Sequence, residues 1–168
     1  MINDDIISYS KDFMFIKSFL DKLFENIGIG KINKGNSFIE FDNSLIANDF
    51  LQFKVSSENS IDLFFFIEYD NLRVDILNLP EIIEYSVGDI KKDYNKIYDE
   101  LKDILTLKCI VTNRCGCYRL KFIDSNGKVI RKYTFGYGLL SVLTLCICPF
   151  VTIKKYSPIY EKSENWVK

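Results

Sequence analysis

The sequence predicts an α+β protein in which two principal helices pack against antiparallel β-sheet of about eight strands. Two segments carry apolar residues at spacings of three and four, and two others alternate apolar and polar residues with period two. The chain is 48% apolar and holds 14 Phe and 10 Tyr but 8 Gly and 3 Pro, a composition typical of an aromatic-rich core. Its 168 residues fit a single domain spanning 1–168.

The first helix is expected between Ser10 and Gly28. Ser10 is a favourable N-cap, and Gly28 a favourable residue to end a helix. Between them apolar residues recur at helical spacing: Phe13, Ile16, Leu20, Leu23 and Ile27. Three more rings, Phe15, Phe19 and Phe24, widen this apolar stripe, so we expect the helix to be deeply packed.

Four antiparallel strands are expected between Ser37 and Asn78, where the apolar period becomes two. The segments between them are rich in Asp, Asn and Ser, the residues that favour turns. In the third of these strands, Phe64 and Phe66 lie on the face opposite Phe65. This strand is therefore predicted to be central and covered on both faces.

Helical periodicity returns after this sheet. Pro80 is expected to open a short helix through Tyr85, and a long helix is expected to begin at Asp89. Its apolar positions again recur at four and three: Ile90, Tyr94, Ile97, Leu101 and Ile104. The charged residues on its other side indicate a solvated face.

Further strands are expected at 107–112, 118–123 and 128–135. The last two are joined by Asp124 to Gly127, which contains the Asn-Gly pair favoured in hairpins. Residues 138–153 are ambiguous between helix and strand, and their Val, Thr, Cys and Ile content favours a strand pair bent near Pro149. The C-terminal tail is predicted to be a loosely attached arm.

The charges are divided between two parts of the chain. Residues 1–106 hold 11 Lys and Arg against 20 Asp and Glu, a net −9, whereas residues 107–168 hold 11 against 3, a net +8. The prediction is an acidic helix–sheet–helix portion followed by a basic β-rich portion. Such asymmetry bears on association with charged partners more than on the fold.

The sequence lacks the residues of most common catalytic systems. It contains no histidine, which removes the usual general base, and no phosphate-binding or nucleophile-elbow motif. We therefore expect a binding protein that needs no cofactor. An enzyme that uses carboxylates in place of histidine is a further alternative.

The leading hypothesis is that the protein binds one basic protein partner through the acidic face of the first sheet. The candidate residues fall on strands and turns opposite the apolar face: Glu40, Asp42, Asp62, Glu68, Asp70 and Asp75. Acidic surface steers association with a basic partner. In architecture and charge, a helix on an acidic antiparallel sheet without catalytic residues resembles the immunity proteins of bacteria, which implies neutralisation of a basic toxin domain.

The alternative hypothesis is that the basic C-terminal hairpin binds nucleic acid or another polyanion. The candidate cations are Arg119, Lys121, Arg131 and Lys132. Four nearby rings would offer surfaces on which bases stack: Tyr118, Tyr133, Phe135 and Tyr137. The acidic half of the chain opposes this hypothesis, because it repels phosphate at long range.

Cysteine content and chain start favour residence in the cytosol. The start carries two acids and no basic segment before an apolar run, so no secretory signal is expected. The weakly polar stretch 138–153 is too short to span a bilayer, so no membrane segment is expected. Reduced thiols are then the expected state, with a zinc site as a minor alternative formed by two C-x-C pairs: Cys115, Cys117, Cys146 and Cys148.

Overall fold

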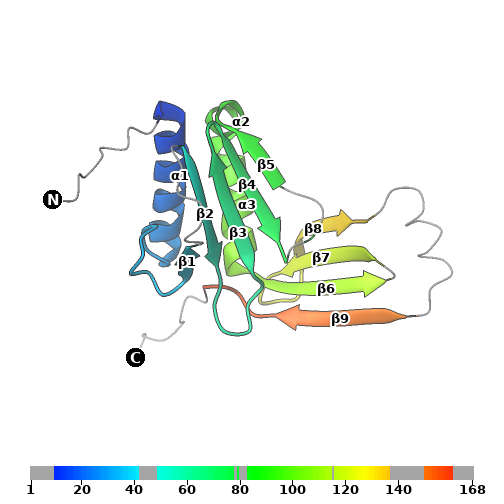
Figure 1. The fold of residues 1–168 in the computed structure, drawn as a ribbon. Helices are drawn as coiled ribbons and strands as arrows, with labels where there is room; N and C mark the ends of the chain where they lie inside the picture. The colour runs from blue at the N-terminus through cyan, green and yellow to red at the C-terminus, as the bar shows by residue number, and fades with distance from the viewer. Residues whose placement is uncertain are drawn as a thin grey trace.

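The computed structural model describes residues 10–41, 49–77, 79, 83–114, 116–136 and 150–160. These residues form an α+β fold with three helices and two antiparallel sheets of five and four strands (Figure 1). The helices are α1 (Lys11–Ile27), α2 (Val87–Lys92) and α3 (Tyr94–Thr106). The strands are β1 (Ile39–Phe41), β2 (Phe50–Val55), β3 (Leu63–Glu68), β4 (Asn71–Ile76), β5 (Ile83–Ser86), β6 (Lys108–Arg114), β7 (Cys117–Ile123), β8 (Val129–Phe135) and β9 (Val151–Tyr156). The predicted fold class is confirmed.

Helix α1 begins and ends where the sequence predicts. The Ser10 hydroxyl accepts a hydrogen bond from the Phe13 amide at 3.2 Å, which satisfies one of the free N–H groups of the first turn. Gly28 ends the helix with φ of 97°, a left-handed conformation that glycine adopts without steric cost. Phe19 and Phe24 are almost fully buried, whereas Phe15 is half-buried, so the expected deep packing is confirmed for two of the three rings.

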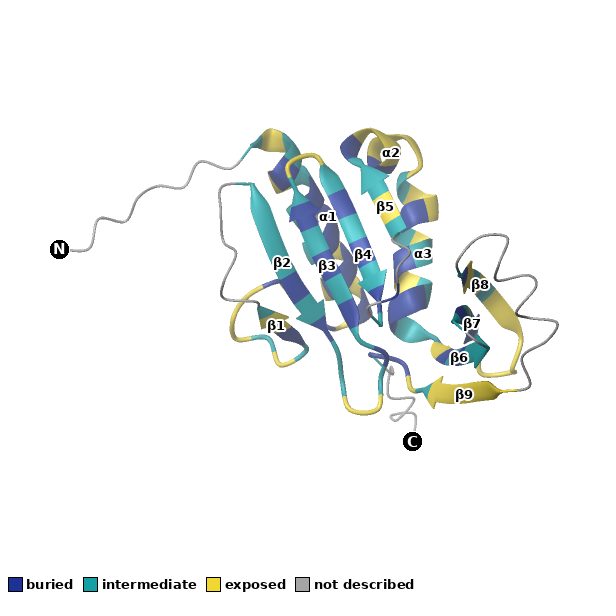
Figure 2. Cartoon of the chain, turned by 45° about the vertical axis from the view of Figure 1, so that its right-hand side comes forward, coloured by how far each residue is buried: buried dark blue, intermediate teal, exposed yellow. Residues whose placement is uncertain are grey.

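The five-stranded sheet is an antiparallel meander with the strand order β1-β2-β3-β4-β5. Register places Phe53 of β2 opposite Phe65 of β3, and Phe65 opposite Val74 of β4, all on the buried face. The rings of Phe53 and Phe65 stack with centroids 5.3 Å apart. Helices α1 and α3 lie behind this face, so the core forms between helices and sheet (Figure 2).

The segment between the first sheet and α3 differs from the prediction. A helix was expected through Tyr85, but Ile83–Ser86 forms β5, which pairs with β4. The single long helix expected from Asp89 is instead two helices, α2 and α3, separated at Asp93. Ser86 caps α2: its hydroxyl accepts from the Asp89 amide at 3.1 Å, and the Asp89 carboxylate accepts from the Ser86 amide at 3.0 Å.

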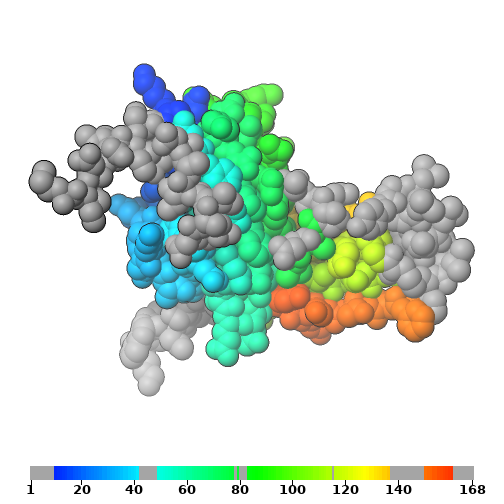
Figure 3. Space-filling view, in the orientation of Figure 1, coloured from blue at the N-terminus to red at the C-terminus, as the bar shows by residue number. Residues whose placement is uncertain are grey.

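The four-stranded sheet has the order β8-β7-β6-β9 and projects sideways from the first sheet (Figures 1 and 3). Only Leu107 separates α3 from β6, so the boundary between the acidic and basic parts of the sequence falls where the second sheet begins. Buried side chains of both sheets belong to one hydrophobic cluster, which includes Phe65 of β3 and Phe122 of β7.

The last part of the chain brings one confirmation and one correction. Residues 151–153 lie in a strand, as expected, whereas residues 138–149 lie outside the described part of the chain. The expected loose attachment of the tail is wrong for residues 157–160. Ile159 is 2% exposed, and its amide donates to the Leu105 carbonyl at 3.1 Å. Burying an isoleucine side chain is worth about 2 kcal/mol, enough to hold this segment on α3.

Candidate protein-binding surfaces

The five-stranded sheet has one face that no described helix or strand covers. Residues directly opposite each other in an antiparallel pair share a face, and register therefore defines this surface. We call it the outer face. Its members are Glu40, Phe50, Gln52, Lys54, Phe64, Phe66, Glu68, Asn71, Arg73, Asp75, Glu84 and Ser86.

The prediction that β3 is central is confirmed. Among the described elements, α1 and α3 cover the face of Phe65 and none covers the face of Phe64 and Phe66, so coverage of both faces stays a prediction. Phe64 and Phe66 are half-buried. Their neighbours in register, Lys54 and Arg73, lie beside the rings. The long stems of such side chains shield apolar surface while their charges stay hydrated.

Arg73 lies at the centre of the outer face. Its Nε and Nη2 donate to the two carboxylate oxygens of Asp75 at 3.2 and 3.1 Å. Its guanidinium carbon lies 4.1 Å from the ring centroid of Phe66. A two-point hydrogen bond and a ring contact fix the orientation of the planar guanidinium group. Sequence reasoning missed Arg73, although strand alternation already placed it on the face of Asp75.

The acidic candidates divide into paired and unpaired carboxylates. Asp75 is bound to Arg73, and Asp62 forms an ion pair with Lys54 at 3.1 Å. Within the described part of the chain, Glu40 and Glu68 take part in no ion pair or side-chain hydrogen bond.

The remaining acids lie at or beyond the margin of this face. Glu84 is exposed on the neighbouring strand, and within the described residues it too has no ion pair. Asp70 lies exposed in the β3–β4 turn and accepts from the Asn71 side chain at 3.1 Å. Asp42 lies outside the described residues. The outer face therefore has an aromatic and arginine centre and an acidic margin.

The candidate cations of the second sheet lie on both of its faces. Arg119, Lys121 and Lys132 lie on the face turned away from α3, where Lys121 and Lys132 are directly opposite in register. Arg131 lies on the other face, because consecutive strand residues point to opposite sides. Its Nε donates to the Asp103 carboxylate of α3 at 2.7 Å. The four predicted polyanion-binding residues thus do not form one surface.

The rings expected to accompany these cations face α3 instead. Tyr133 packs edge-on against Phe122 and stacks on Phe135, and Tyr118 lies opposite Phe135 in register. Tyr137 lies outside the described residues. In the described part of the second sheet, these rings therefore lie on the face opposite Arg119, Lys121 and Lys132, and Arg131, which shares their face, is paired with Asp103. The predicted surface that mixes these four cations with rings for base stacking is not formed.

A polar cluster joins the two sheets through α3. The Tyr133 hydroxyl donates to the Glu100 carboxylate at 2.5 Å, beside the Arg131–Asp103 ion pair. Burial and the adjacent Glu100 carboxylate raise the pKa of both Tyr133 and Tyr85. Both phenols therefore stay protonated near neutral pH. The residues of this cluster come from β5, α3 and β8, so no local pattern in the sequence predicts them.

The cysteine pairs can be placed only in part. Cys117 is buried in β7, whereas Cys115, Cys146 and Cys148 lie outside the described residues, so the zinc alternative stays a prediction. Among the residues that can be placed, no three His, Cys, Asp or Glu side chains come together as metal ligands. Cys109 is fully buried, and burial raises the pKa of its thiol to about 12, which keeps it protonated.

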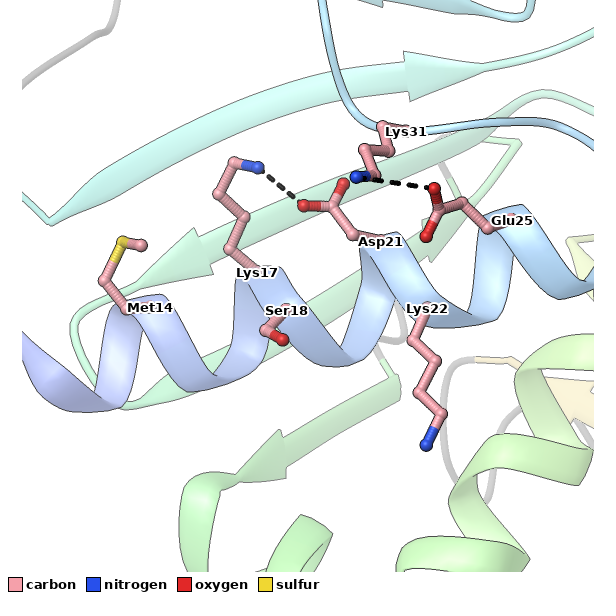
Figure 4. Close-up of a pocket in the computed structure, with 7 residues that line it drawn as sticks. All are labelled: Met14, Lys17, Ser18, Asp21, Lys22, Glu25 and Lys31. Atoms are coloured by element: carbon pink, nitrogen blue, oxygen red, sulfur yellow. Dashed lines mark hydrogen bonds and ion pairs between the residues drawn. The ribbon is translucent and has the colours of Figure 1, made fainter.

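A shallow hollow on the exposed side of α1 is lined mainly by charged residues (Figure 4). Lys17 Nζ lies 2.7 Å from a carboxylate oxygen of Asp21, and Lys31 Nζ lies 3.5 Å from Glu25. The other Asp21 oxygen accepts from the Ile32 amide at 2.8 Å. These carboxylates therefore hold the loop after α1 in place, and we assign them no chemistry.

Fold and surfaces together define a two-sheet α+β protein with an aromatic and acidic face on one sheet and a basic face on the other. No protein-family model, curated protein or solved structure matches the chain. Within the described residues, no helix has the length and apolar character needed to cross a membrane.

Proposed function

We propose that the protein is a binding module that takes one basic protein partner on the outer face of its five-stranded sheet. The observation that carries this proposal is the composition of that face. Arg73 and the half-buried rings of Phe64 and Phe66 form its centre, and Glu40, Glu68 and Glu84 lie around them.

This arrangement matches the anatomy of protein interfaces. Binding energy in such interfaces concentrates on a few central aromatic and arginine residues that are desolvated on binding. Arg73 is already oriented by Asp75 and Phe66, so less side-chain entropy is lost on binding. The surrounding carboxylates attract a basic partner and disfavour acidic ones.

The biological role we propose is neutralisation of a basic toxin domain. A small acidic protein that occludes a cationic surface competes with the polyanion that the surface would otherwise bind. Support for this role comes from the acidic margin of the outer face and from the net −9 of residues 1–106.

The test is capture of partners from the source lysate, followed by binding measurements with the purified partner. The Glu40→Lys/Glu84→Lys variant reverses two exposed charges on the outer face. We expect it to weaken binding about tenfold or more, mainly through a slower association rate. The control Glu58→Lys/Asp99→Lys changes the net charge equally, but at exposed positions of the β2–β3 loop and α3.

The outcomes separate face-specific binding from a general charge effect. Equal weakening in both variants would mean that only net charge matters and would overturn the assignment to the outer face. Unchanged affinity in the Glu40→Lys/Glu84→Lys variant would do the same. A Phe66→Ala variant tests the centre of the face and is expected to increase the dissociation rate.

A further inference from the structure

We propose that β9 is a docking edge that takes an extended acidic segment of a partner protein as an additional antiparallel strand. Strand β9 is at the edge of the second sheet and pairs with β6 on one side only. No described strand pairs with its other side. An edge strand directs every second pair of backbone N–H and C=O groups away from the sheet, where another chain can bond to them.

The contacts at the end of β9 indicate which backbone groups are free. The Ser157 amide, directly after the strand, donates to the Asn59 carbonyl of the β2–β3 loop at 3.0 Å instead of to β6. Alternation along an extended strand then directs the amides of Val151, Ile153 and Lys155 to the same side, away from β6. The Ser60–Ser157 bridge closes this edge at one end, so the edge that no described strand occupies is Val151–Tyr156.

The edge lacks two common forms of protection against pairing. No proline interrupts Val151–Tyr156, and its six residues pair with β6 in continuous register. Val151 is 49% exposed and Ile153 is 60% exposed, high values for branched apolar side chains in a strand (Figure 2). These side chains offer apolar contact to an incoming strand on the face turned away from α3.

The charges around β9 favour an acidic partner. Lys155 lies in one register row with Ile110, Lys121 and Lys132, and Lys154 lies on the opposite face of β9. The one acid in the described part of the second sheet, Asp124, accepts from the backbone amides of Asn126 and Lys128 in its own turn. Lysines on an edge oppose pairing with a like-charged strand, including β9 of a second copy. An acidic strand is attracted instead.

Register then defines the sequence pattern of the incoming segment. In antiparallel addition, acidic residues face Lys155 and Lys154, an apolar residue faces Ile153, any residue faces Thr152, and an apolar residue faces Val151. The pattern is acidic, acidic, apolar, any, apolar. A nucleic acid fits this surface less well, because register places the rings of the described strands, Tyr156 included, on the face of α3, and the same-face neighbours of Lys155 are the aliphatic Ile110 and Ile153.

This inference is independent of the proposed function, because it uses the other sheet and a partner of opposite charge. Occupation of both surfaces would make the protein a bridge between a basic partner and an acidic one. The two proposals can fail separately, since the Glu40→Lys/Glu84→Lys variant leaves β9 unchanged.

The first test is amide hydrogen exchange on the full chain, with and without the synthetic peptide acetyl-Ser-Glu-Glu-Val-Thr-Val-Ser-amide. In the free protein we expect fast exchange at Val151, Ile153 and Lys155 and slow exchange at Thr152 and Lys154, which alternation places toward β6. The peptide should slow exchange at the first three amides. Slow exchange at all three in the free protein would show that the edge is already paired and would overturn the proposal.

The second test measures affinity by fluorescence anisotropy with the same peptide, a scrambled peptide and a short oligothymidine. Ile153→Pro removes an amide directed away from β6, so the fold should be retained while peptide binding is lost. Lys154→Glu/Lys155→Glu should weaken binding at least about tenfold, and added salt should weaken it in the wild type.

Three results would overturn the proposal. The first is absence of peptide binding up to about 1 mM, the weak end of specific association. The second is binding of oligothymidine but not of the peptide, which would favour a polyanion site. The third is concentration-dependent dimerisation in sedimentation that Ile153→Pro abolishes, which would make a second copy the occupant. Circular dichroism melting of each variant confirms that it is folded.

Discussion

The hydroxyl of Tyr133 on β8 donates to the carboxylate of Glu100 on α3, and this hydrogen bond of 2.5 Å ties the second sheet to the helix that supports the first. Tyr133 and Glu100 are each half-buried, so water competes for the pair only in part. A hydrogen bond to a partly buried, charged carboxylate contributes more to stability than a hydrogen bond between neutral groups. The contact therefore helps to fix how the two sheets are held together.

Replacement of Tyr133 by phenylalanine should lower the free energy of unfolding by about 1–2 kcal/mol. The ring remains, but the Glu100 carboxylate loses its donor. Urea denaturation of the full chain measures this difference. Tyr69→Phe is the control, because Tyr69 is 69% exposed and its hydroxyl forms no hydrogen bond with the described residues. An equal decrease in the free energy of unfolding in the two variants would contradict the role assigned to the hydrogen bond.

Stability should fall at alkaline pH because the pKa values of Tyr133 and Tyr85 are raised by burial and by Glu100. Well below pH 10, the ordinary tyrosine pKa, both phenols are protonated in the folded and unfolded states alike. Above it, the unfolded chain loses these protons before the folded protein does, so the free energy of unfolding decreases. The slope is about 1.4 kcal/mol per pH unit for each tyrosine.

Urea denaturation between pH 9 and about 11, compared with Tyr85→Phe/Tyr133→Phe, isolates the contribution of the two phenols. A variant with the same pH dependence as the wild type would show that these tyrosines titrate normally in the folded protein. Absorbance of tyrosinate provides a direct measure of the same ionisation.

Arg73 and Asp75 should show a favourable coupling of about 1 kcal/mol in a double-mutant cycle. Their side chains are 32% and 16% exposed, so solvent screening reduces the value expected for a buried pair. Arg73→Met, Asp75→Ala and the double variant, unfolded with urea at low and high salt, provide the measurement. If the decreases in the free energy of unfolding caused by the two single substitutions add up to the decrease in the double variant, the two-point contact adds nothing to stability.

Gly28→Ala should be more destabilising than Gly127→Ala by at least about 1 kcal/mol. Both glycines have positive φ, 97° and 79°, so a methyl group strains the backbone at each position. At Gly28 the added carbon also meets the Tyr160 hydroxyl and ring, whereas at Gly127 nothing lies within 4 Å. Thermal or urea unfolding compares them, and equal destabilisation would contradict the packing of Tyr160 on the end of α1.

Tyr69→Asn should raise the free energy of unfolding by about 0.5–1 kcal/mol. Tyr69 is the first residue of the two-residue β3–β4 turn and has φ of 52°, a conformation that asparagine adopts more readily than tyrosine. The exposed ring contributes little packing. A decrease in stability, measured in the same urea experiment, would show that the ring makes contacts worth more than the backbone strain.

The elements that the sequence predicted correctly have signals at both ends. Ser10 and Gly28 bound a continuous helical stripe, and Asp124 to Gly127 separate two clear alternations, so α1 and the β7–β8 hairpin could be located. Strand β5 was missed because its four residues are stabilised by pairing with β4, a contact that local periodicity does not contain. The break at Asp93 was missed because apolar spacing continues unchanged from Ile90 to Tyr94.

The candidate surfaces were predictable where strand alternation determines them. Alternation placed Glu40 and Asp75 opposite the apolar face, and the structure brings them into one register row through Lys54 and Phe64. The distribution of charge on that face depends on two ion pairs: Arg73 with Asp75, which alternation along one strand could have predicted, and Lys54 with Asp62, which requires the pairing of β2 with β3. The direction of Arg131 toward α3 depends on how the second sheet packs, which no single segment of sequence specifies.

The order of the strands affects the sequence of events in which the chain folds. In the first sheet every strand pairs with its neighbour in sequence, so each hairpin closes only a short loop. The β6–β9 pairing joins residues 109–114 to 151–156, and the intervening chain includes β7 and β8 and their connections. Closing that long loop costs more chain entropy, and contacts between distant segments form slowly. We therefore expect the first sheet to form early and β9 to be added last.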